Sequence, residues 1–437
     1  MARATTTTAT SERYAKLTKT SHDLWERAVR VLPGGNTRTT TFQDPYPLYL
    51  VRGEGCRVFD VDGIERIDFI SNYTSLVLGH CHPRVVAAVQ RQAAQLMSAA
   101  APSELEVELA ERLRERLPSM ELIRFANSGT EATMQAIRVA RAFTDRTTVA
   151  TFAGAYHGTH DYASSIPATA AERAGGTGIP AGVASSLVVA PFNDAEGTRA
   201  VLEPHFDDLA AVIVEPVQGA AGVIPARQEF LASLRELADE AGALLIFDEV
   251  IAFRIGYHGA QGQYGIIPDL TALGKIIGGG LAIGAFGGRA DVMALFDPRN
   301  DRRLGHGGTF NGNPLTMAAG LATLTELTPE ALDRLEKLTL ELKAKLEQLF
   351  ADVGLPALVT QSGSLFNLHL REGEVLDHSD VLASDTTLLQ ELHLAMLGHG
   401  VLFTPRGMGC LSIPMTDSEV DAFAEAARLG LRDLGVV

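Results

Sequence analysis

The segment PDLTALGKIIGGG, residues 268–280, decides the fold because it joins a short apolar run to a lysine and three glycines. The run 270–273 has the length of a buried strand, and Lys275 follows directly after its end. A lysine there can act as a nucleophile when a low-dielectric site depresses its pKa, and residues 278–280 would let the backbone approach a ligand closely. A lysine beside glycines is more often a charged loop residue, so this segment needs support from other parts of the chain.

The first support is ALLIFDEV, residues 243–250, an apolar run that ends in Asp248 and Glu249. A carboxylate at a buried strand end is costly unless it meets a cation or a strong donor. A protonated pyridine nitrogen would be such a partner, and the pairing makes the ring an electron sink. A surface turn is the alternative for one of the two acids. Asp248 precedes Lys275 by about one helix and one strand, so neighbouring strand ends can bring them together.

The second support is RFANSGTEATMQAIRVARAF, residues 124–143, in which a strand enters a helix through Ser128, Gly129 and Thr130. Small hydroxyl residues and a glycine at a helix N-terminus present backbone N–H groups and a positive dipole end to an anion. Taken alone, such residues more often form a plain helix cap. Together with the other two segments, they predict a phosphate site at the same edge of the sheet.

Six short apolar runs alternate with helical stretches between residues 80 and 328, which predicts an α/β fold with a mostly parallel sheet. The runs are residues 122–126, 149–152, 186–190, 211–214, 243–247 and 270–273. We therefore expect residues 80–328 to form a large domain that carries the ligand site.

Both ends of the chain predict a smaller α+β domain. We expect a disordered Thr-rich lead at residues 1–20, and a short helix followed by an antiparallel meander within residues 21–79. Residues 329–437 would complete this domain, with a Leu-striped helix whose apolar face is core and with strands near residues 364–370 and 401–403. A capping box, Thr416 to Glu419, begins the last helix.

Composition excludes several other classes of protein. The 437 residues include 53 acidic and 37 basic side chains, a formal charge of -16, so a nucleic acid would be repelled from most of the surface. The weakly polar run 276–288 is too short to span a membrane. Three scattered cysteines, Cys56, Cys81 and Cys410, match neither a disulfide framework nor a metal site. We expect a cytoplasmic protein with reduced thiols and no metal.

Six motifs carry a resemblance to a known family: NSGTEA, AYHG, EPVQG, FDEV, TALGKIIGGG and GGTFNGNP, in this order. The chain resembles the class III (ornithine-type) aminotransferases of pyridoxal 5'-phosphate (PLP) fold type I, from about residue 31 to residue 436. The resemblance implies PLP as cofactor, a large domain with a mostly parallel sheet, and a small domain built from both chain ends. It also implies a homodimer in which the subunits share each cofactor site.

The resemblance further implies a role for each matching residue. Lys275 would hold the cofactor as a Schiff base and move the substrate proton, while Asp248 would bind the pyridine nitrogen. Val250 would pack behind the ring and Tyr156 would stack on its other face. The remaining cofactor-binding residues would be Ser128, Gly129 and Thr130 at the phosphate, Thr309 at the partner's phosphate, Glu215 and Gln218 at the hydroxyl edge, and His157.

Within this class the chain most resembles the branch of glutamate semialdehyde aminomutase and the beta-amino acid aminotransferases. Arg38 in GGNTRTT and Arg406 in FTPRGMG match carboxylate-binding arginines of the beta-amino acid enzymes. The planar arginine fork suits a carboxylate, although each could also be a solvated loop residue. Arg254 is a third candidate. Three further residues would line the substrate pocket or belong to the core: Tyr73, Leu76 and Val77.

These observations lead to a hypothesis of beta-amino acid transamination, with a donor similar to beta-phenylalanine and with 2-oxoglutarate or pyruvate as acceptor. An aminomutase of the glutamate semialdehyde type and a broad omega-amine transaminase are alternatives. A non-catalytic PLP-fold regulator is a remote alternative, because the site residues are retained, the net charge is acidic, and the roughly twenty residues before the first expected helix are too few for the DNA-binding domain that such regulators usually carry.

Overall fold

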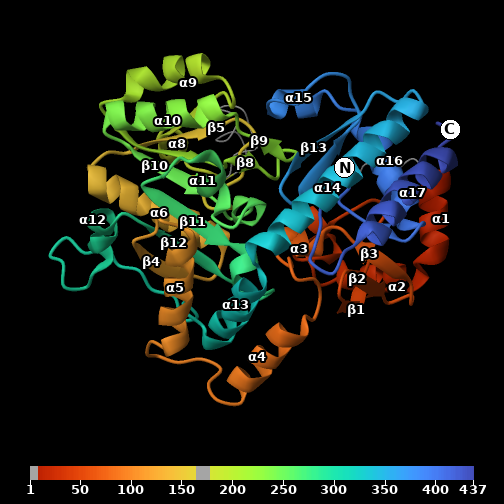
Figure 1. Ribbon diagram of the computed structural model, residues 1–437, viewed down its shortest axis with the longest axis horizontal. Helices are drawn as coiled ribbons and strands as arrows, with labels where there is room; N and C mark the ends of the chain where they lie inside the picture. Colours follow the sequence, from red (N-terminus) through yellow and green to blue (C-terminus); the bar gives the residue numbers. More distant parts are fainter. Residues whose placement is uncertain (1–7, 164–177) are drawn as a thin grey trace.

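A seven-stranded sheet positions the predicted site in the computed structural model, which describes residues 8–163 and 178–437 (Figure 1). The strands are β4 (Leu122–Ala126), β5 (Thr148–Phe152), β6 (Leu187–Ala190), β7 (Leu209–Val214), β10 (Leu244–Asp248), β11 (Leu270–Gly274) and β12 (Gly284–Gly288). Their order is β4-β12-β11-β10-β7-β5-β6. All neighbours from β11 to β6 are parallel, whereas β12 is antiparallel to β11 and to β4.

The six strands predicted for this sheet are confirmed, and β12 is the strand that the sequence did not reveal. Three of the five residues of β12 are glycines, which have low strand propensity. Close backbone packing explains them. A Cβ at Gly284 would lie 2.0 Å from the carbonyl oxygen of Ser128, and one at Gly288 would lie 2.1 Å from that of Asp269. Glycine is needed here because neighbouring backbone occupies the space of a side chain.

Hydrophobic cores cover both faces of the sheet. Along β7, Val212 and Val214 belong to one core, whereas Ala211 and Ile213 belong to the other. The helix α6 (Gly129–Thr144) contributes to the second core, and α10 (Gln228–Ala241) contributes to the first. Strands buried on both faces read as continuous apolar runs, which is why the sequence revealed them.

A second sheet joins the two ends of the chain. Its strands are β1 (Leu50–Glu54), β2 (Arg57–Asp60), β3 (Glu65–Asp68) and β15 (Val401–Leu402), in this order. The predicted antiparallel meander is confirmed as β1 to β3, and β15 adds to β3 in parallel. The chain ends therefore share one sheet, while the predicted domain boundaries at residues 79 and 328 stay a prediction.

The remaining elements are helices and the strands of two smaller sheets, β13-β14-β16 and β8-β9 (Figure 1). The helices are α2 (Lys19–Ala28), α3 (Ser71–Thr74), α4 (Pro83–Ala93), α5 (Glu104–Arg116), α8 (Ala181–Ala184), α9 (Ala195–Leu202), α11 (Gly259–Tyr264), α12 (Ala290–Met293), α13 (Pro314–Glu326), α14 (Pro329–Asp352), α15 (His378–Leu382), α16 (Thr386–Leu397) and α17 (Asp417–Asp433). The further strands are β8 (Val217–Gln218), β9 (Ile224–Pro225), β13 (Leu358–Ser362), β14 (Leu365–His369) and β16 (Met408–Cys410). None of the helices within the described ranges is long and apolar enough to cross a membrane.

Two predictions about helices in the C-terminal segment are confirmed. The leucine stripe of α14 packs into the largest hydrophobic core, with Leu335, Leu342 and Leu346 fully buried. The helix α17 begins at Thr416, whose side chain and that of Glu419 form the expected capping box. The apolar stripe and the cap are local features, and the structure contains both where the sequence placed them.

The prediction of a disordered lead at residues 1–20 is wrong for the part that the structure describes. The helix α1 (Ala9–Leu17) begins at a capping box formed by Thr8 and Ser11. Tyr14 is buried, and its hydroxyl donates to the backbone carbonyl of Tyr46 at 2.8 Å. This anchor lies far along the chain, so local composition did not reveal it. Residues 1–7 lie outside the described residues.

A buried histidine on α16 gives the fold a predicted pH dependence. Burial lowers the pKa of His393 to about 3, whereas an unfolded histidine titrates near 6.5. The folded state keeps the ring neutral, so stability is complete above pH 6.5 and falls as the pH drops from 6.5 toward 3. At pH 5 this linkage costs roughly 2 kcal/mol.

We expect His393→Gln to be less stable than the wild type at pH 7.5, because the variant loses the packing of the ring. The difference should shrink by about 2 kcal/mol at pH 5, since glutamine does not titrate. Thermal or urea unfolding of both proteins at the two pH values measures this. An equal difference at both values would contradict the assignment.

Candidate active site

Lys275 stands directly after β11, at the carboxyl end of the parallel part of the sheet. Its backbone adopts φ +51°, a left-handed conformation that costs a residue with a side chain roughly 1–2 kcal/mol. Burial lowers the pKa of the Lys275 ammonium, and the negative charges of Asp248 and Glu215 act in the opposite direction. A strained, desolvated lysine of this kind suits nucleophilic chemistry.

Asp248 ends the neighbouring strand β10, where the structure buries its carboxylate. One oxygen lies 2.8 Å from Nδ1 of His157, and the other accepts the backbone N–H of Val250 at 3.0 Å. Nε2 of His157 is also buried and has no hydrogen-bond partner among the described residues. The prediction that neighbouring strand ends bring Asp248 and Lys275 together agrees with the parallel pairing of β10 and β11.

Glu215 and Tyr156 lie close enough to Asp248 for its charge to act on both, and Gln218 lies on the next short strand. Glu215 follows β7 and accepts the backbone N–H of Tyr156 at 2.8 Å and that of Gly219 at 3.3 Å. Burial raises the pKa of the Glu215 carboxyl, and Asp248 adds to the increase. Gln218 donates to the carbonyl of Ala153 at 2.9 Å, while its buried Oε1 has no partner among the described residues. Burial and the two carboxylates also raise the pKa of the Tyr156 phenol.

The predicted phosphate residues form the N-terminus of α6. Ser128 is the N-cap, and its hydroxyl accepts the backbone N–H of Glu131 at 3.1 Å. A Cβ at Gly129 would lie 2.8 Å from Cγ1 of Val250, so only glycine allows this close approach. The first N–H groups of a helix have no partner within the helix and are available to an anion. The same contact brings Val250 against the predicted phosphate cup.

This arrangement fits PLP. A phosphate can accept from the N-terminus of α6, a protonated ring nitrogen can meet the buried Asp248 carboxylate, and Lys275 can reach an aldehyde. The unpaired buried atoms of His157 and Gln218 show that the site presents polar groups beyond those satisfied within the fold. When bound, PLP supplies an electron sink that stabilises negative charge on the substrate carbon.

The two predicted carboxylate-binding arginines are both exposed, and they lie on different loops. Arg38 donates from Nη1 to Oδ1 of Asn72 at 2.9 Å, and its guanidinium lies 5.7 Å from the ring centroid of Tyr73. Arg406 lies in the turn between β15 and β16. Burial lowers the pKa of His378 on α15, and the positive charge of Arg406 adds to this effect.

His378 lies beside one of the predicted cofactor residues. A Cβ at Gly154 would lie 2.5 Å from the Cβ of His378 and 3.3 Å from Oε1 of Gln218. His378 therefore stands beside Gln218, with Arg406 close enough to influence its titration. Sequence reasoning missed both His378 and Asn72, because neither belongs to a recognisable motif and their importance lies in tertiary contacts.

Arg254, the third arginine candidate, has a different environment from the one predicted. It lies in a 3-10 turn, Ala252–Ile255, and is almost completely buried. Its guanidinium donates to Oγ of Ser364 at 2.8 Å, to the carbonyl of Thr74 at 2.8 Å and to the carbonyl of Leu411. These contacts occupy the guanidinium, so the structure argues against Arg254 as a substrate-binding residue and gives it a structural role.

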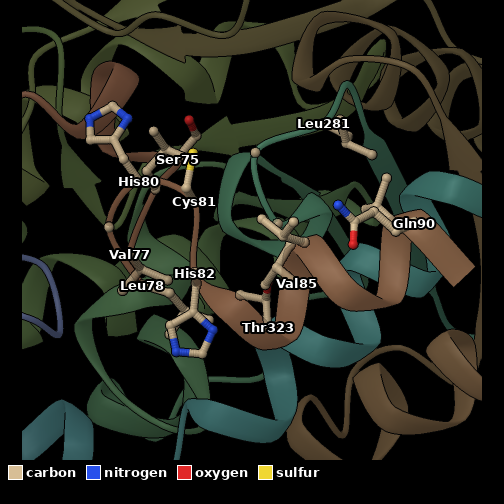
Figure 2. Close-up of a pocket in the computed structure, with 16 residues that line it drawn as sticks. Ser75, Val77, Leu78, His80, Cys81, His82, Val85, Gln90, Leu281 and Thr323 are labelled. Carbon is tan, nitrogen blue, oxygen red and sulfur yellow. The ribbon is translucent and has the colours of Figure 1, made fainter. Parts of the chain in front are cut away.

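Leu76 and Val77 line a cavity of about 340 Å³ beside α4 (Figure 2). Figure 2 shows Val85 and Gln90 projecting from α4 toward this cavity, with Leu281 at its edge. Val77 is also buried in the largest hydrophobic core, so the alternative that it is a core residue is confirmed. Leu76 is only partly buried.

Thr309 lies on an exposed loop. With Ser98 and Pro102 it lines a surface cleft of about 620 Å³. The described lining of this cleft includes none of the cofactor residues on β10, β11 or α6.

Comparison with known proteins identifies the family. The chain matches the family model of class-III aminotransferases over residues 40–422. It is 42% identical to the beta-phenylalanine transaminase of Variovorax paradoxus over 415 residues, 95% of this chain and 93% of that protein. It is 42% identical to glutamate-1-semialdehyde 2,1-aminomutase of Desulforudis audaxviator over 422 residues, 94% of this chain and 97% of that protein. An omega-transaminase structure from Sphaerobacter thermophilus matches with TM-score 0.91 and 47% identity, covering 94% of this chain and 97% of that one.

The chain therefore belongs to the class III aminotransferases, as its six motifs indicated. Its α/β architecture is PLP fold type I, and the protein is a PLP-dependent aminotransferase. The similarity to both a transaminase and an aminomutase confirms the predicted branch of the family.

Replacing Asp248 with Asn should lower the rate of amino transfer at least about a hundredfold, because it removes a positioned charge from the ring nitrogen. The amide should also disturb the 2.8 Å contact with His157. Rapid-mixing measurements of each half-reaction give the rate, and absorbance of the protein-bound cofactor confirms loading. A fully loaded variant with an unchanged rate would exclude this role for Asp248.

Proposed function

We propose that this enzyme transfers the amino group of a beta-amino acid, with an aryl or alkyl side chain, to 2-oxoglutarate or pyruvate. The observation that carries the proposal is the placement of Arg38 on an exposed loop beside Tyr73, with a guanidinium whose hydrogen bond is to a neutral amide. Arginine binds a carboxylate with two parallel hydrogen bonds. The similarity to a beta-phenylalanine transaminase supports the same class of donor.

The geometry of the two substrates supports the use of two arginines. A beta-amino acid carries its carboxylate one carbon farther from the amine than an alpha-keto acid carries it from the carbonyl. One fixed guanidinium cannot make good bidentate contacts with both. We assign the donor carboxylate to Arg38 and the alpha-carboxylate of the acceptor to Arg406, whose flanking Pro405 and Gly407 shape a short turn.

The cofactor residues have separate roles in this proposal. Lys275 binds the cofactor and moves the proton at the substrate carbon, while Asp248 keeps the ring nitrogen protonated. Val250 supports one face of the ring and Tyr156 covers the other. The phosphate is bound by Ser128, Gly129 and Thr130, and the hydroxyl edge is contacted by Glu215 and Gln218.

We also propose a homodimer in which Thr309 reaches the phosphate site of the partner subunit. The support is an apolar surface around its loop. Met97 is 62% exposed and Phe310 is 60% exposed. The two segments are connected, because Asn313 donates to the carbonyl of Met97 at 3.2 Å. Exposed large apolar side chains at adjoining loops are typical of a protein interface.

An aminomutase is the second candidate, and the identity to glutamate-1-semialdehyde 2,1-aminomutase favours it. An aminomutase returns the amino group to the same carbon skeleton and therefore needs no external acceptor. Turnover of beta-phenylalanine with and without added keto acid separates the two functions. Product formation that depends on the keto acid supports transamination, whereas turnover without it supports the aminomutase.

Lys275→Ala should abolish turnover, because the substitution removes both the covalent attachment and the proton carrier. Borohydride treatment followed by peptide mapping should place the cofactor on Lys275 in the wild type and on no residue of the variant. A variant with near-normal activity would contradict the central role of this lysine.

Arg38→Ala should raise the donor KM, and Arg406→Ala should raise the acceptor KM, each by roughly 10- to 100-fold, since a charge-assisted hydrogen bond contributes roughly 1.5–3 kcal/mol. Steady-state kinetics that vary donor and acceptor separately measure both effects. Equal damage to the two substrates by both variants would reject the division between the arginines.

A further inference from the structure

The short element α3 is a strained, left-handed turn rather than a regular helix, and it lies beside Arg38. Ser71, Asn72, Tyr73 and Thr74 have φ values of +48°, +49°, +53° and +73°, so four consecutive residues with side chains occupy the left-handed region. Each such residue costs roughly 1–2 kcal/mol, and only Asn adopts this conformation readily. A turn of this cost persists only where surrounding contacts fix it, and such turns cluster at functional sites.

Buried polar contacts fix the turn at both ends. At its start, Oδ1 of the buried Asp68 accepts the backbone N–H of Ile70 at 2.8 Å and that of Ser71 at 3.0 Å. At its end, the carbonyl of Thr74 accepts from Nη1 of Arg254 at 2.8 Å. Arg254 follows Asp248 on the same segment of chain, so this contact ties the turn to the strand that carries the cofactor acid.

The turn also adjoins the lysine loop. The backbone N–H of Leu76 donates to the carbonyl of Ser71 at 3.0 Å, and Cδ2 of Leu76 lies 2.8 Å from the Cβ position of Gly280. Gly280 belongs to the glycine segment that follows Lys275. The turn thus contacts the segments that follow β10 and β11, and its two central side chains project toward Arg38.

Those side chains hold Arg38 without neutralising it. Oδ1 of Asn72 accepts from Nη1 at 2.9 Å, and the Tyr73 ring lies 5.7 Å from the guanidinium carbon. The Tyr73 hydroxyl donates to the carbonyl of Thr40, which fixes the ring. A guanidinium has five N–H donors, so one amide oxygen leaves enough of the fork for a bidentate carboxylate.

We propose that Asn72 is a positioning and specificity residue, which orients Arg38 for the donor carboxylate while leaving its charge free. This inference rests on the proposed role of Arg38. An aspartate at the same position would pair with Arg38 and compete with the substrate carboxylate. The neutral amide therefore selects donors that carry a carboxylate, and amines that lack one do not depend on it.

The test compares Asn72→Asp and Asn72→Ala with the wild-type holoenzyme. We expect Asn72→Asp to raise the KM for beta-phenylalanine roughly 10- to 100-fold, because an internal ion pair replaces the substrate contact. Asn72→Ala should raise it about two- to fivefold, because it removes one neutral hydrogen bond. The KM for the keto acid and the kcat/KM for 1-phenylethylamine, which has no carboxylate, should stay within about twofold.

Thr39→Asp is the matched control, since it adds the same charge next to Arg38 on an exposed side chain, whereas the hydrogen bond of the guanidinium is to Asn72. Its donor KM should change less than about threefold, because exposed charges are screened. If Thr39→Asp raised the donor KM as much as Asn72→Asp, a nearby negative charge alone would explain the result, and the inference would be overturned.

Arg38→Ala separates the two proposals. If it raises the donor KM and Asn72→Asp does not, the role of Asn72 is wrong and the proposed function stands. If Arg38→Ala leaves the donor KM unchanged, the proposed binding of the donor carboxylate by Arg38 is wrong. If Asn72→Asp impairs beta-phenylalanine and 1-phenylethylamine equally, Asn72 has only a structural role and the inference is overturned.

Discussion

The hydrogen bond between Asp248 and His157 is the interaction on which the site depends. A carboxylate at the end of an interior strand loses its hydration, and the fold must compensate for that loss. It does so with the imidazole at 2.8 Å and the Val250 N–H at 3.0 Å. Because His157 belongs to a loop after β5, this pairing also sets the position of Tyr156, whose N–H is held by Glu215. The buried Asp248 carboxylate and its contacts therefore position residues at the ends of β10, β5 and β7.

Much of the fold could be predicted from the sequence, because its determinants are local. Strands buried on both faces are apolar runs, and α14 and α17 have an apolar stripe and a cap, respectively. The strand β12 has no continuous apolar run. Its glycines are required because the backbone of Ser128 and that of Asp269 occupy the space of a side chain. The helix α1 was missed for a related reason, since Tyr14 is held by Tyr46 rather than by its neighbours.

The residues of the site also fall into those that the sequence revealed and those that it did not. Residues within motifs, such as Lys275 and Asp248, could be assigned because the resemblance covers them, and the structure places them on adjacent strand ends. The sequence did not show that Arg254 is buried, so it was grouped with Arg38 and Arg406. In the structure its guanidinium donates hydrogen bonds to Ser364, Thr74 and Leu411. Asn72 could not be selected from the sequence, because its left-handed backbone and its hydrogen bond to Arg38 are features of the folded structure.

The pairing of β15 with β3 has a consequence for synthesis on the ribosome. Every strand of the seven-stranded sheet has been translated before Val401 emerges. Until then, the edge of β3 that pairs with β15 is uncovered. An uncovered strand edge is a template for association with other chains. The nascent protein thus carries an unfinished N-terminal sheet through most of its elongation.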